Sequence, residues 1–164
     1  MFITIREGGK EDLPRVLELI RELAEFEKAL EQVILTVEMM EKDGFGPDPV
    51  FEFYVAGNDH GKIFGMALYY YRYSTWKGKT LFLEDIIVSS GERGNGIGKA
   101  LFEWVIQKAQ KENCQRMSWQ VLNWNKPAIR FYENYDAHID DEWLNFDLYK
   151  DQLDRFHRWN EGNK

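Results

Sequence analysis

A glycine-rich stretch in the second half of the chain is the strongest local sign of a ligand site. The stretch reads Arg93-Gly94-Asn95-Gly96-Ile97-Gly98-Lys99 and lies between an apolar segment and an amphipathic one. A loop of this kind aims backbone N–H groups at phosphate oxygens, and the N-terminus of a following helix favours negative charge. The stretch therefore predicts a phosphate-binding loop, with a glycine-rich turn that binds no ligand as the alternative.

Two common phosphate motifs are excluded by the spacing. A P-loop needs a glycine five residues before Gly98 and Ser or Thr after Lys99, whereas these positions hold Arg93 and Ala100. A dinucleotide fingerprint needs Gly-x-Gly-x-x-Gly in the first strand-to-helix turn. Here the spacing is Gly-x-Gly-x-Gly, and it follows four expected strands. The loop therefore belongs to another class of phosphate site.

Two adjacent carboxylates interrupt the apolar segment just before this loop. Glu84 and Asp85 stand in the middle of Leu81–Val88, whose other members are apolar. Successive side chains of a regular strand point to opposite faces, so a strand covered by helices on both sides cannot send both carboxylates to solvent. Burying an unpaired carboxylate is unfavourable, which favours a functional pocket. The alternative is an edge strand with one face in water.

A third segment, Trp124–Tyr132, is typical of a strand exit followed by a helix start. Asn125 suits an N-cap and Pro127 suits the first helical turn. Tyr132 lies further along the same helix, where it is either a core aromatic or a proton donor for a nearby reaction. The single cysteine, Cys114, has no histidine near it in sequence, which favours a structural role.

Hydrophobic periodicity predicts the elements that position these residues. The expected strands are Phe2–Ile5, Val50–Val55, Ile63–Tyr71, Thr80–Val88, Met117–Leu122 and Trp143–Tyr149. The expected helices are Leu13–Ala24, Thr36–Lys42, Ile97–Ala109 and Pro127–Tyr135. This succession of elements predicts an α/β fold with a mixed, mostly antiparallel sheet, one parallel βαβ crossover and helices on both faces. A ligand crevice is expected at the crossover.

Composition limits the function classes. A chain of 164 residues with 44% hydrophobic and 30% charged residues predicts a single domain over residues 1–164. The net charge of −7 argues against nucleic acid as a partner and favours small cations. One cysteine and three scattered histidines predict no metal site. We find no signal region and no apolar run approaching about 18 residues, which predicts a cytoplasmic protein with no membrane partner.

The glycine loop and the Trp124–Tyr132 segment together resemble the GNAT superfamily of N-acetyltransferases. The expected element order is similar to that family's fold over almost the whole chain. Further blocks resemble its diamine branch, the spermidine/spermine and thialysine N-acetyltransferases. These blocks are Glu22–Glu27, Glu31–Thr36, Asp43–Gly46 and Leu83–Asp85.

The resemblance implies acetyl-CoA as cosubstrate. It implies that the backbone of Ile86, Ile87 and Val88 pairs with the pantetheine arm, that the loop from Arg93 to Lys99 holds the pyrophosphate, and that Asn125, Lys126, Pro127 and Ala128 hold the cosubstrate on its other side. By the same resemblance Glu84 is the general base and Tyr132 the acid that protonates the leaving thiolate. The implied substrate contacts are Phe26, Glu27, Trp76, Glu84, Asp85, Ser118, Trp119 and Gln120.

The accepted amine is expected to be a small diamine or a lysine analogue. Polyamine-specific relatives carry Asp-Pro before the tryptophan matched by Trp76, whereas this chain has Ser74-Thr75. This substitution and the run Gln120–Asn125 resemble the thialysine-type branch. We hypothesise that the hydroxyl pair accepts the amino-acid end of the substrate more readily than a second carboxylate would.

Three further expectations follow from the resemblance. Relatives are homodimers, and the late aromatics Trp143, Phe146, Tyr149, Phe156 and Trp159 are compatible with a homodimer or with plain core packing. Asp136 stands where the family has glycine after a helix, and Asp141 or Glu142 is the candidate for a late acidic substrate contact. The alternatives are an acetyltransferase for a protein or another amine acceptor, and a non-catalytic acetyl-CoA-binding module.

Overall fold

The structure is a computed structural model that describes residues 3–156. Two compact units meet in the chain between Gln120 and Val121. A single domain over residues 1–164 therefore stays a prediction. None of the described helices is both long and apolar enough to cross a membrane.

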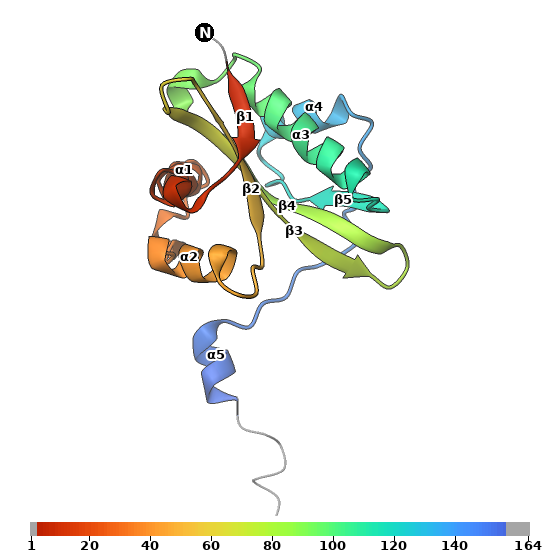
Figure 1. The fold of residues 1–164 in the computed structure, drawn as a ribbon. Coiled ribbons are helices and arrows are strands. Elements are labelled where there is room, and N and C mark those ends of the chain that lie inside the picture. The colour runs from red at the N-terminus through yellow and green to blue at the C-terminus, as the bar shows by residue number, and fades with distance from the viewer. Residues whose placement is uncertain (1–2, 157–164) are drawn as a thin grey trace, which may run out of the picture. The chain divides into compact units, whose positions relative to one another are not determined.

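The first unit contains a five-stranded mixed sheet (Figure 1). Its strands are β1 (Thr4–Glu7), β2 (Glu52–Gly57), β3 (Ile63–Ser74), β4 (Gly78–Val88) and β5 (Arg116–Trp119), and they lie side by side in chain order. The pairs from β1 to β4 are antiparallel, and β5 runs parallel to β4. The predicted α/β class, the antiparallel meander and the single parallel crossover are confirmed.

Two helices cover one face of the sheet, α1 (Leu13–Phe26) and α2 (Val37–Phe45). The apolar side chains of α1 recur every three or four residues, so one stripe of the helix is buried on the strands. The core residues on this side are Leu13, Val16, Leu17, Leu19, Met40, Phe53, Val55, Ile63, Met66 and Ile87. Helix α2 begins where predicted, because the Thr36 side chain accepts a hydrogen bond from the Met39 amide.

The crossover helix α3 (Ile97–Lys111) covers the other face (Figure 1). Its buried residues are Ile97, Leu101, Phe102, Val105 and Ala109. Trp104 of α3 stands edge-on to Tyr54 of β2, with ring centroids 5.3 Å apart. Helices on both faces of the sheet are therefore confirmed, and the predicted phosphate-binding loop lies where the chain passes from β4 to α3.

In the second unit, the residues that the structure describes include the helices α4 (Lys126–Glu133) and α5 (Lys150–Arg155). Asn125 is the N-cap of α4, as predicted, and its side-chain oxygen accepts a hydrogen bond from the Ala128 amide at 3.3 Å. Asp136 has a positive φ of 52°, the left-handed conformation usual for glycine after a helix.

The predicted strand over Trp143–Tyr149 is wrong. These residues have no regular secondary structure, and α5 follows them directly. A strand needs a neighbouring backbone to pair with, and hydrophobic composition alone does not supply one. Tyr149 instead caps α5, since its amide donates to the Gln152 side chain at 2.9 Å. Of the late aromatics, Trp159 lies outside the described residues.

Candidate active site

A β-bulge lies at the two adjacent carboxylates. The register between β3 and β4 passes from Leu68 opposite Asp85 to Tyr69 opposite Leu83, which leaves Glu84 without an opposing residue. A bulge interrupts the alternation of side chains, so the argument from a regular strand does not hold at this point. Glu84 is exposed and Asp85 is partly buried. This pattern agrees with the expectation that the two carboxylates do not both point to solvent, and the bulge itself is a feature often found beside active sites.

Three carboxylates act on one another near this bulge, and we call Glu27, Glu84 and Asp85 the acidic cluster. The pKa of Asp85 is raised from 3.8 to about 6, mainly because burial disfavours its charged form and also because Glu84 and Glu27 carry like charges. Burial also raises the pKa of Glu27. The cluster therefore concentrates negative charge, and a bound ammonium group would relieve the repulsion among its carboxylates.

Tyr70 is a site residue that the sequence did not reveal. Its hydroxyl donates a hydrogen bond to Oε2 of Glu84 at 3.0 Å. Burial and this hydrogen bond raise the pKa of Tyr70 to about 12, so the phenol stays a donor at neutral pH. The run Tyr69-Tyr70-Tyr71 gives no sign of which tyrosine reaches Glu84, because that depends on the bulge and the strand register.

The edge of β4 that faces β5 loses this partner at the same place. The parallel pairing with β5 covers Thr80 to Leu83 and ends with Leu83 opposite Trp119. Beyond Glu84, the residues Ile86, Ile87 and Val88 pair with β3 on the other side. Among the residues of the first unit, β5 therefore leaves the edge of β4 unpaired over the segment predicted to bind the pantetheine arm.

The predicted substrate residues on β5 lie close to the start of this opening. Ser118 is opposite Phe82 and Trp119 is opposite Leu83, the residue before Glu84. The Trp119 ring packs edge-on against Phe102 of α3, with centroids 5.1 Å apart. Trp119 is thus held by the core, and Gln120 follows it as an exposed residue.

The glycine-rich loop has the local geometry of an anion site. Gly94 and Gly96 have φ values of 81° and 76°, which favour glycine, and a Cβ at either position would meet open space. Gly96 is the N-cap of α3 and provides no side-chain cap, so the first amides of the helix lack that partner. These amides, with Arg93 and Lys99 in the same stretch, can hold a phosphate.

Arg93 connects this loop with the end of α1. Its Nε donates to the carbonyl oxygen of Val88 at 2.9 Å, and its guanidinium lies 5.7 Å from the centroid of the Phe26 ring. Glu27 follows Phe26 directly. The structure thus brings the predicted phosphate loop and two predicted substrate residues together in the first unit.

Trp76 is separated from the acidic cluster along the chain. It lies in the turn between β3 and β4 and is 81% exposed. Six residues of extended strand separate Glu84 from Gly78 at the end of this hairpin, a distance of about 20 Å. The Ser74 hydroxyl accepts hydrogen bonds from the Trp76 and Lys77 amides at 3.3 and 3.1 Å, so this serine stabilises the turn.

The remaining predicted site residues belong to the second unit. Asn125 and Ala128 form the N-cap contact of α4, and Nζ of Lys126 donates to the Asn123 carbonyl oxygen at 2.9 Å. Pro127 occupies the first helical turn, where it lacks only an amide that has no helical partner. Tyr132 is partly buried, and its ring lies 5.2 Å from that of Phe131.

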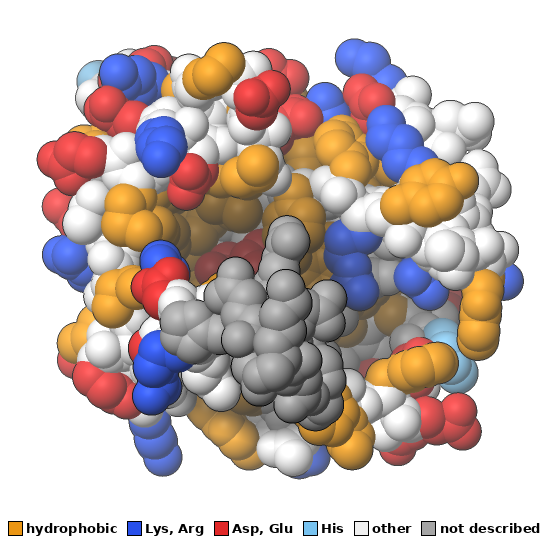
Figure 2. All heavy atoms as spheres, turned by 90° about the horizontal axis from the view of Figure 1, so that it is seen from below, with side chains coloured by type: hydrophobic (Ala, Val, Ile, Leu, Met, Phe, Trp, Pro, Cys, Tyr) orange, Lys and Arg blue, Asp and Glu red, His pale blue; other side chains and the backbone are white. Residues whose placement is uncertain are grey.

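The surface of the molecule carries both signs of charge. On the face shown in Figure 2, acidic and basic side chains are interspersed with exposed hydrophobic ones. Within residues 3–156, no group of three or more His, Cys, Asp and Glu side chains is arranged to hold a metal ion. Burial raises the pKa of the Cys114 thiol, which makes it a poor nucleophile.

Comparison with known proteins assigns the chain to a family. The model of the acetyltransferase (GNAT) family matches residues 14–136. The chain is 41% identical to a thialysine N-epsilon-acetyltransferase of Bos taurus over 143 residues, which cover 83% of this chain and 84% of the relative. It is 34% identical to a spermidine/spermine N(1)-acetyltransferase-like protein of Homo sapiens, over 93% of this chain and 23% of that protein.

Solved structures show the same fold at lower identity. An integron cassette protein of V. cholerae matches with a TM-score of 0.75 and 23% identity, over 94% of this chain and 96% of that one. An aminoglycoside acetyltransferase solved with sisomicin matches with a TM-score of 0.73 and 20% identity, over 90% and 96% of the two chains. The resemblance seen in the glycine loop and the Trp124–Tyr132 segment is thereby confirmed, and relatives of the diamine branch are among the matches. The chain is an N-acetyltransferase that belongs to the acetyltransferase (GNAT) family.

Proposed function

We propose that this enzyme transfers an acetyl group from acetyl-CoA to a primary amine of a small diamine or lysine analogue, with thialysine as the type substrate. The acidic cluster at the β4 bulge is the observation that carries the proposal. Burial, together with the like charges of Glu84 and Glu27, raises the pKa of Asp85 to about 6, and a small dication is the ligand that best offsets such a charge. The names of the thialysine and spermidine/spermine relatives support the same substrate class.

The described residues fit acetyl-CoA. The φ values at Gly94 and Gly96, the open space beside them and the α3 N-terminus without a side-chain cap form a cradle suited to a pyrophosphate. The edge of β4 that β5 leaves unpaired fits an amide-containing arm along Ile86–Val88. Asn125–Ala128 are proposed to hold the cosubstrate from the second unit, as the family resemblance implies. Bound acetyl-CoA supplies the acetyl group as a thioester.

Glu84 is the proposed general base. An alkylamine has a pKa of about 10.4, so roughly one molecule in a thousand is neutral at pH 7 and a base is needed to free its lone pair. The exposed Glu84 carboxylate can accept this proton directly or through water. The hydrogen bond from Tyr70 fixes one of its oxygens, which leaves Oε1 for the amine.

The two remaining roles are stabilisation of charge and protonation of the leaving group. A backbone N–H within Ile86–Val88 is the candidate donor to the negative charge that develops on the acetyl oxygen. Tyr132 on α4 is the proposed proton donor to the leaving thiolate. Direct transfer needs no covalent enzyme intermediate, which agrees with the raised pKa of Cys114.

The substrate class is tested by thiol release from acetyl-CoA with a panel of amines. The panel is thialysine, lysine, ornithine, putrescine, spermidine and spermine, and acetyl-CoA without amine is the control. We expect turnover with thialysine or a short diamine and a lower kcat/KM for spermine. A higher kcat/KM for spermine than for thialysine would contradict the thialysine-type assignment. Tight acetyl-CoA binding without transfer to any amine would indicate a macromolecular acceptor or a binding module.

A homodimer is proposed for the functional protein. Within the second unit, Trp143, Phe146 and Tyr149 are exposed aromatic side chains in a segment without regular structure, a composition common at protein interfaces. Light scattering coupled to size-exclusion chromatography tests this proposal. A mass of two chains supports it, and a monomer at micromolar concentration contradicts it.

A further inference from the structure

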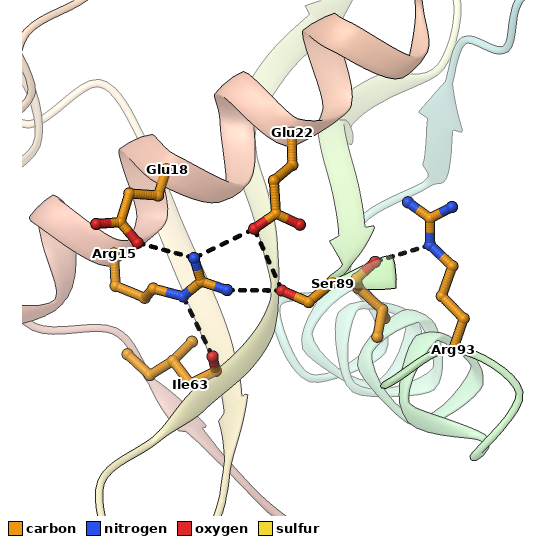
Figure 3. A network of polar contacts seen from close by, with 7 residues as sticks. Arg15, Glu18, Glu22, Ile63, Ser89 and Arg93 are labelled. Atoms are coloured by element: carbon orange, nitrogen blue, oxygen red, sulfur yellow. Dashed lines mark hydrogen bonds and ion pairs between the residues drawn. The ribbon is translucent and has the colours of Figure 1, made fainter. Parts of the chain in front are cut away.

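A ring of polar contacts joins helix α1 to the start of the phosphate-binding loop (Figure 3). Nη2 of Arg15 donates to the Ser89 hydroxyl oxygen at 2.6 Å, and Nη1 of Arg15 donates to Oε1 of Glu22 at 3.2 Å. The Ser89 hydroxyl donates to the same Glu22 oxygen at 3.4 Å. We call Arg15, Glu22 and Ser89 the α1–loop ring, since each member contacts the other two.

The donors and acceptors of the three ring members match one another. Arginine only donates, a carboxylate only accepts, and a hydroxyl does both, so the three side chains fit together without a competing proton. Nε of Arg15 also donates to the carbonyl oxygen of Ile63 on β3 at 3.3 Å. Arg15 therefore fastens α1, β3 and the loop at one point, and its partly buried position strengthens the contacts.

Ser89 is the residue through which the ring reaches the loop. It follows the last residue of β4 and is the N-cap of the short 3₁₀ turn Ser90–Glu92. The side-chain oxygen of a serine at an N-cap usually accepts a hydrogen bond from a backbone amide of the turn that follows. The Ser89 side chain makes no such cap contact. Its hydroxyl is directed to Arg15 and Glu22 instead, while its backbone amide donates to the Phe64 carbonyl oxygen at 2.8 Å.

The position of Ser89 is transmitted along the loop by short contacts. The Glu92 amide donates to the Ser89 carbonyl oxygen at 2.9 Å, and the Asn95 side-chain amide donates to the Glu92 carbonyl oxygen at 3.2 Å. Asn95 lies between the two glycines with positive φ, Gly94 and Gly96. The direction in which the loop amides point therefore depends on where Ser89 is held.

Another side-chain tether of the loop is weaker. Nζ of Lys62 pairs with Glu92 at 3.3 Å, but the Lys62 side chain is 66% exposed. Exposed pairs of this kind contribute little because water screens them and long side chains lose entropy. The α1–loop ring has more contacts, and the Arg15 side chain is less exposed than that of Lys62, so the ring is the stronger constraint.

We propose that Arg15 is a positioning residue for acetyl-CoA binding: through Ser89 it fixes the start of the β4–α3 loop and so the direction of the amides that hold the pyrophosphate. The inference rests on the proposed function, because it assigns to Arg15 an effect on that same ligand. Arg15 acts through Ser89 and makes no contact with the reacting groups.

Calorimetric titration of the full chain with acetyl-CoA tests this role. Arg15→Gln removes the fork of donors and is expected to raise the acetyl-CoA Kd about 10-fold. Ser89→Ala deletes a single oxygen and is expected to raise it in the same direction. Because both belong to one ring, the double variant is expected to match Arg15→Gln within about twofold. Glu18→Gln is the matched control, since Glu18 pairs with Arg15 at 2.8 Å outside the ring, and its Kd is expected to stay within about twofold of wild type.

Two further readouts separate positioning from general destabilisation. In steady-state kinetics the KM for acetyl-CoA is expected to rise in Arg15→Gln while the KM for the amine stays the same. In hydrogen exchange without ligand, amides of residues 90–96 are expected to exchange faster in Arg15→Gln and Ser89→Ala than in Glu18→Gln. A merely structural role would instead lower the melting temperature, while the KM for acetyl-CoA and the relative exchange rates of these amides stay unchanged.

The outcomes that overturn the inference differ from those that overturn the proposed function. If wild type binds acetyl-CoA and both Arg15→Gln and Ser89→Ala bind it equally well, only the positioning role is wrong. If the effects of the two substitutions multiply in the double variant, the ring does not act as a unit and the role is also wrong. If wild type does not bind acetyl-CoA, the proposed function fails and the inference fails with it. Should Arg15→Gln not fold, Ser89→Ala alone decides.

Discussion

The Tyr70 hydroxyl lies 3.0 Å from Oε2 of Glu84 and donates a hydrogen bond to it. Tyr70 lies opposite Phe82, so Glu84, two residues further along β4, is its diagonal neighbour, and the bulge takes Glu84 out of the regular pairing between β3 and β4. The proposed base is therefore held by a neutral donor, whose pKa of about 12 keeps its proton in place at the pH of catalysis.

Loss of this hydrogen bond is expected to slow catalysis. Tyr70→Phe keeps the ring and removes the donor, so we expect kcat to fall about 10-fold with little change in the acetyl-CoA KM. Tyr73→Phe is the control, because Tyr73 is 81% exposed on the same hairpin. An unchanged kcat in Tyr70→Phe would show that the contact does not position the base.

The raised pKa of Asp85 predicts a specific pH dependence of stability. Between its ordinary pKa of 3.8 and the folded value of about 6, the folded state holds a proton that the unfolded state has lost. The free energy of unfolding therefore decreases as the pH rises through this window. Asp85→Asn removes the effect and is expected to be more stable than wild type by about 1 to 3 kcal/mol at pH 7.

Urea denaturation at pH 4, 5, 6 and 7 measures this difference. Asp48→Asn is the control, since Asp48 is an exposed carboxyl outside the acidic cluster. If the free energies of unfolding of Asp85→Asn and wild type are equal at every pH, the folded state does not disfavour the charged form of Asp85.

The pair Arg6–Asp12 predicts the opposite dependence at acid pH. The guanidinium of Arg6 contacts both oxygens of the buried Asp12 at 2.6 and 2.8 Å, and the Gly9 amide also donates to Asp12. These contacts lower the pKa of Asp12, so their stabilisation is present above pH about 4 and is lost as the pH falls through the lowered value.

Arg6→Gln should therefore be destabilised by about 1 to 3 kcal/mol at pH 7. Its difference from wild type in urea denaturation should shrink below pH about 4, where Asp12 becomes protonated. Arg21→Gln, at an exposed position of α1, should have the same free energy of unfolding as wild type, both at pH 7 and below pH about 4. A difference that stays constant with pH would rule out the ion pair as its cause.

Tyr71 gives a test of an unsatisfied group. Its hydroxyl oxygen is buried and has no hydrogen-bond partner among residues 3–156, while its ring centroid lies 4.3 Å from Nζ of Lys79. Tyr71→Phe keeps the ring contact and removes the unpaired hydroxyl, so thermal denaturation should show unchanged or slightly increased stability. Tyr69→Phe is the comparison, because the Tyr69 hydroxyl donates to Glu52 at 3.2 Å and its loss should destabilise by about 1 kcal/mol. Equal losses in both variants would contradict this account.

Local signals in the sequence predicted much of the fold. The caps at Thr36 and Asn125 were readable because a short polar side chain precedes a periodic segment. The meander and the crossover followed from strand periodicity and the glycine loop. The strand expected over Trp143–Tyr149 failed because pairing is a long-range property that apolar composition does not encode.

The contacts of the site were less predictable than its residues. Glu84 and Asp85 stood out as charges in an apolar run, but the bulge that governs their exposure depends on the register of two strands. Tyr70 and Arg15 are polar residues within otherwise ordinary elements, and their partners are 14 and 74 positions away. Such contacts exist only after the sheet and α1 have packed.

The most direct test of the account is the turnover number of Glu84→Gln and Tyr132→Phe with thialysine and saturating acetyl-CoA. The proposed base and acid roles predict that kcat falls about 10²-fold or more in each variant, while the acetyl-CoA Kd changes little. Glu25→Gln, at an exposed position near the end of α1, should keep the wild-type kcat. A kcat within about twofold of wild type in Glu84→Gln would contradict the central claim that this carboxylate accepts the proton of the amine.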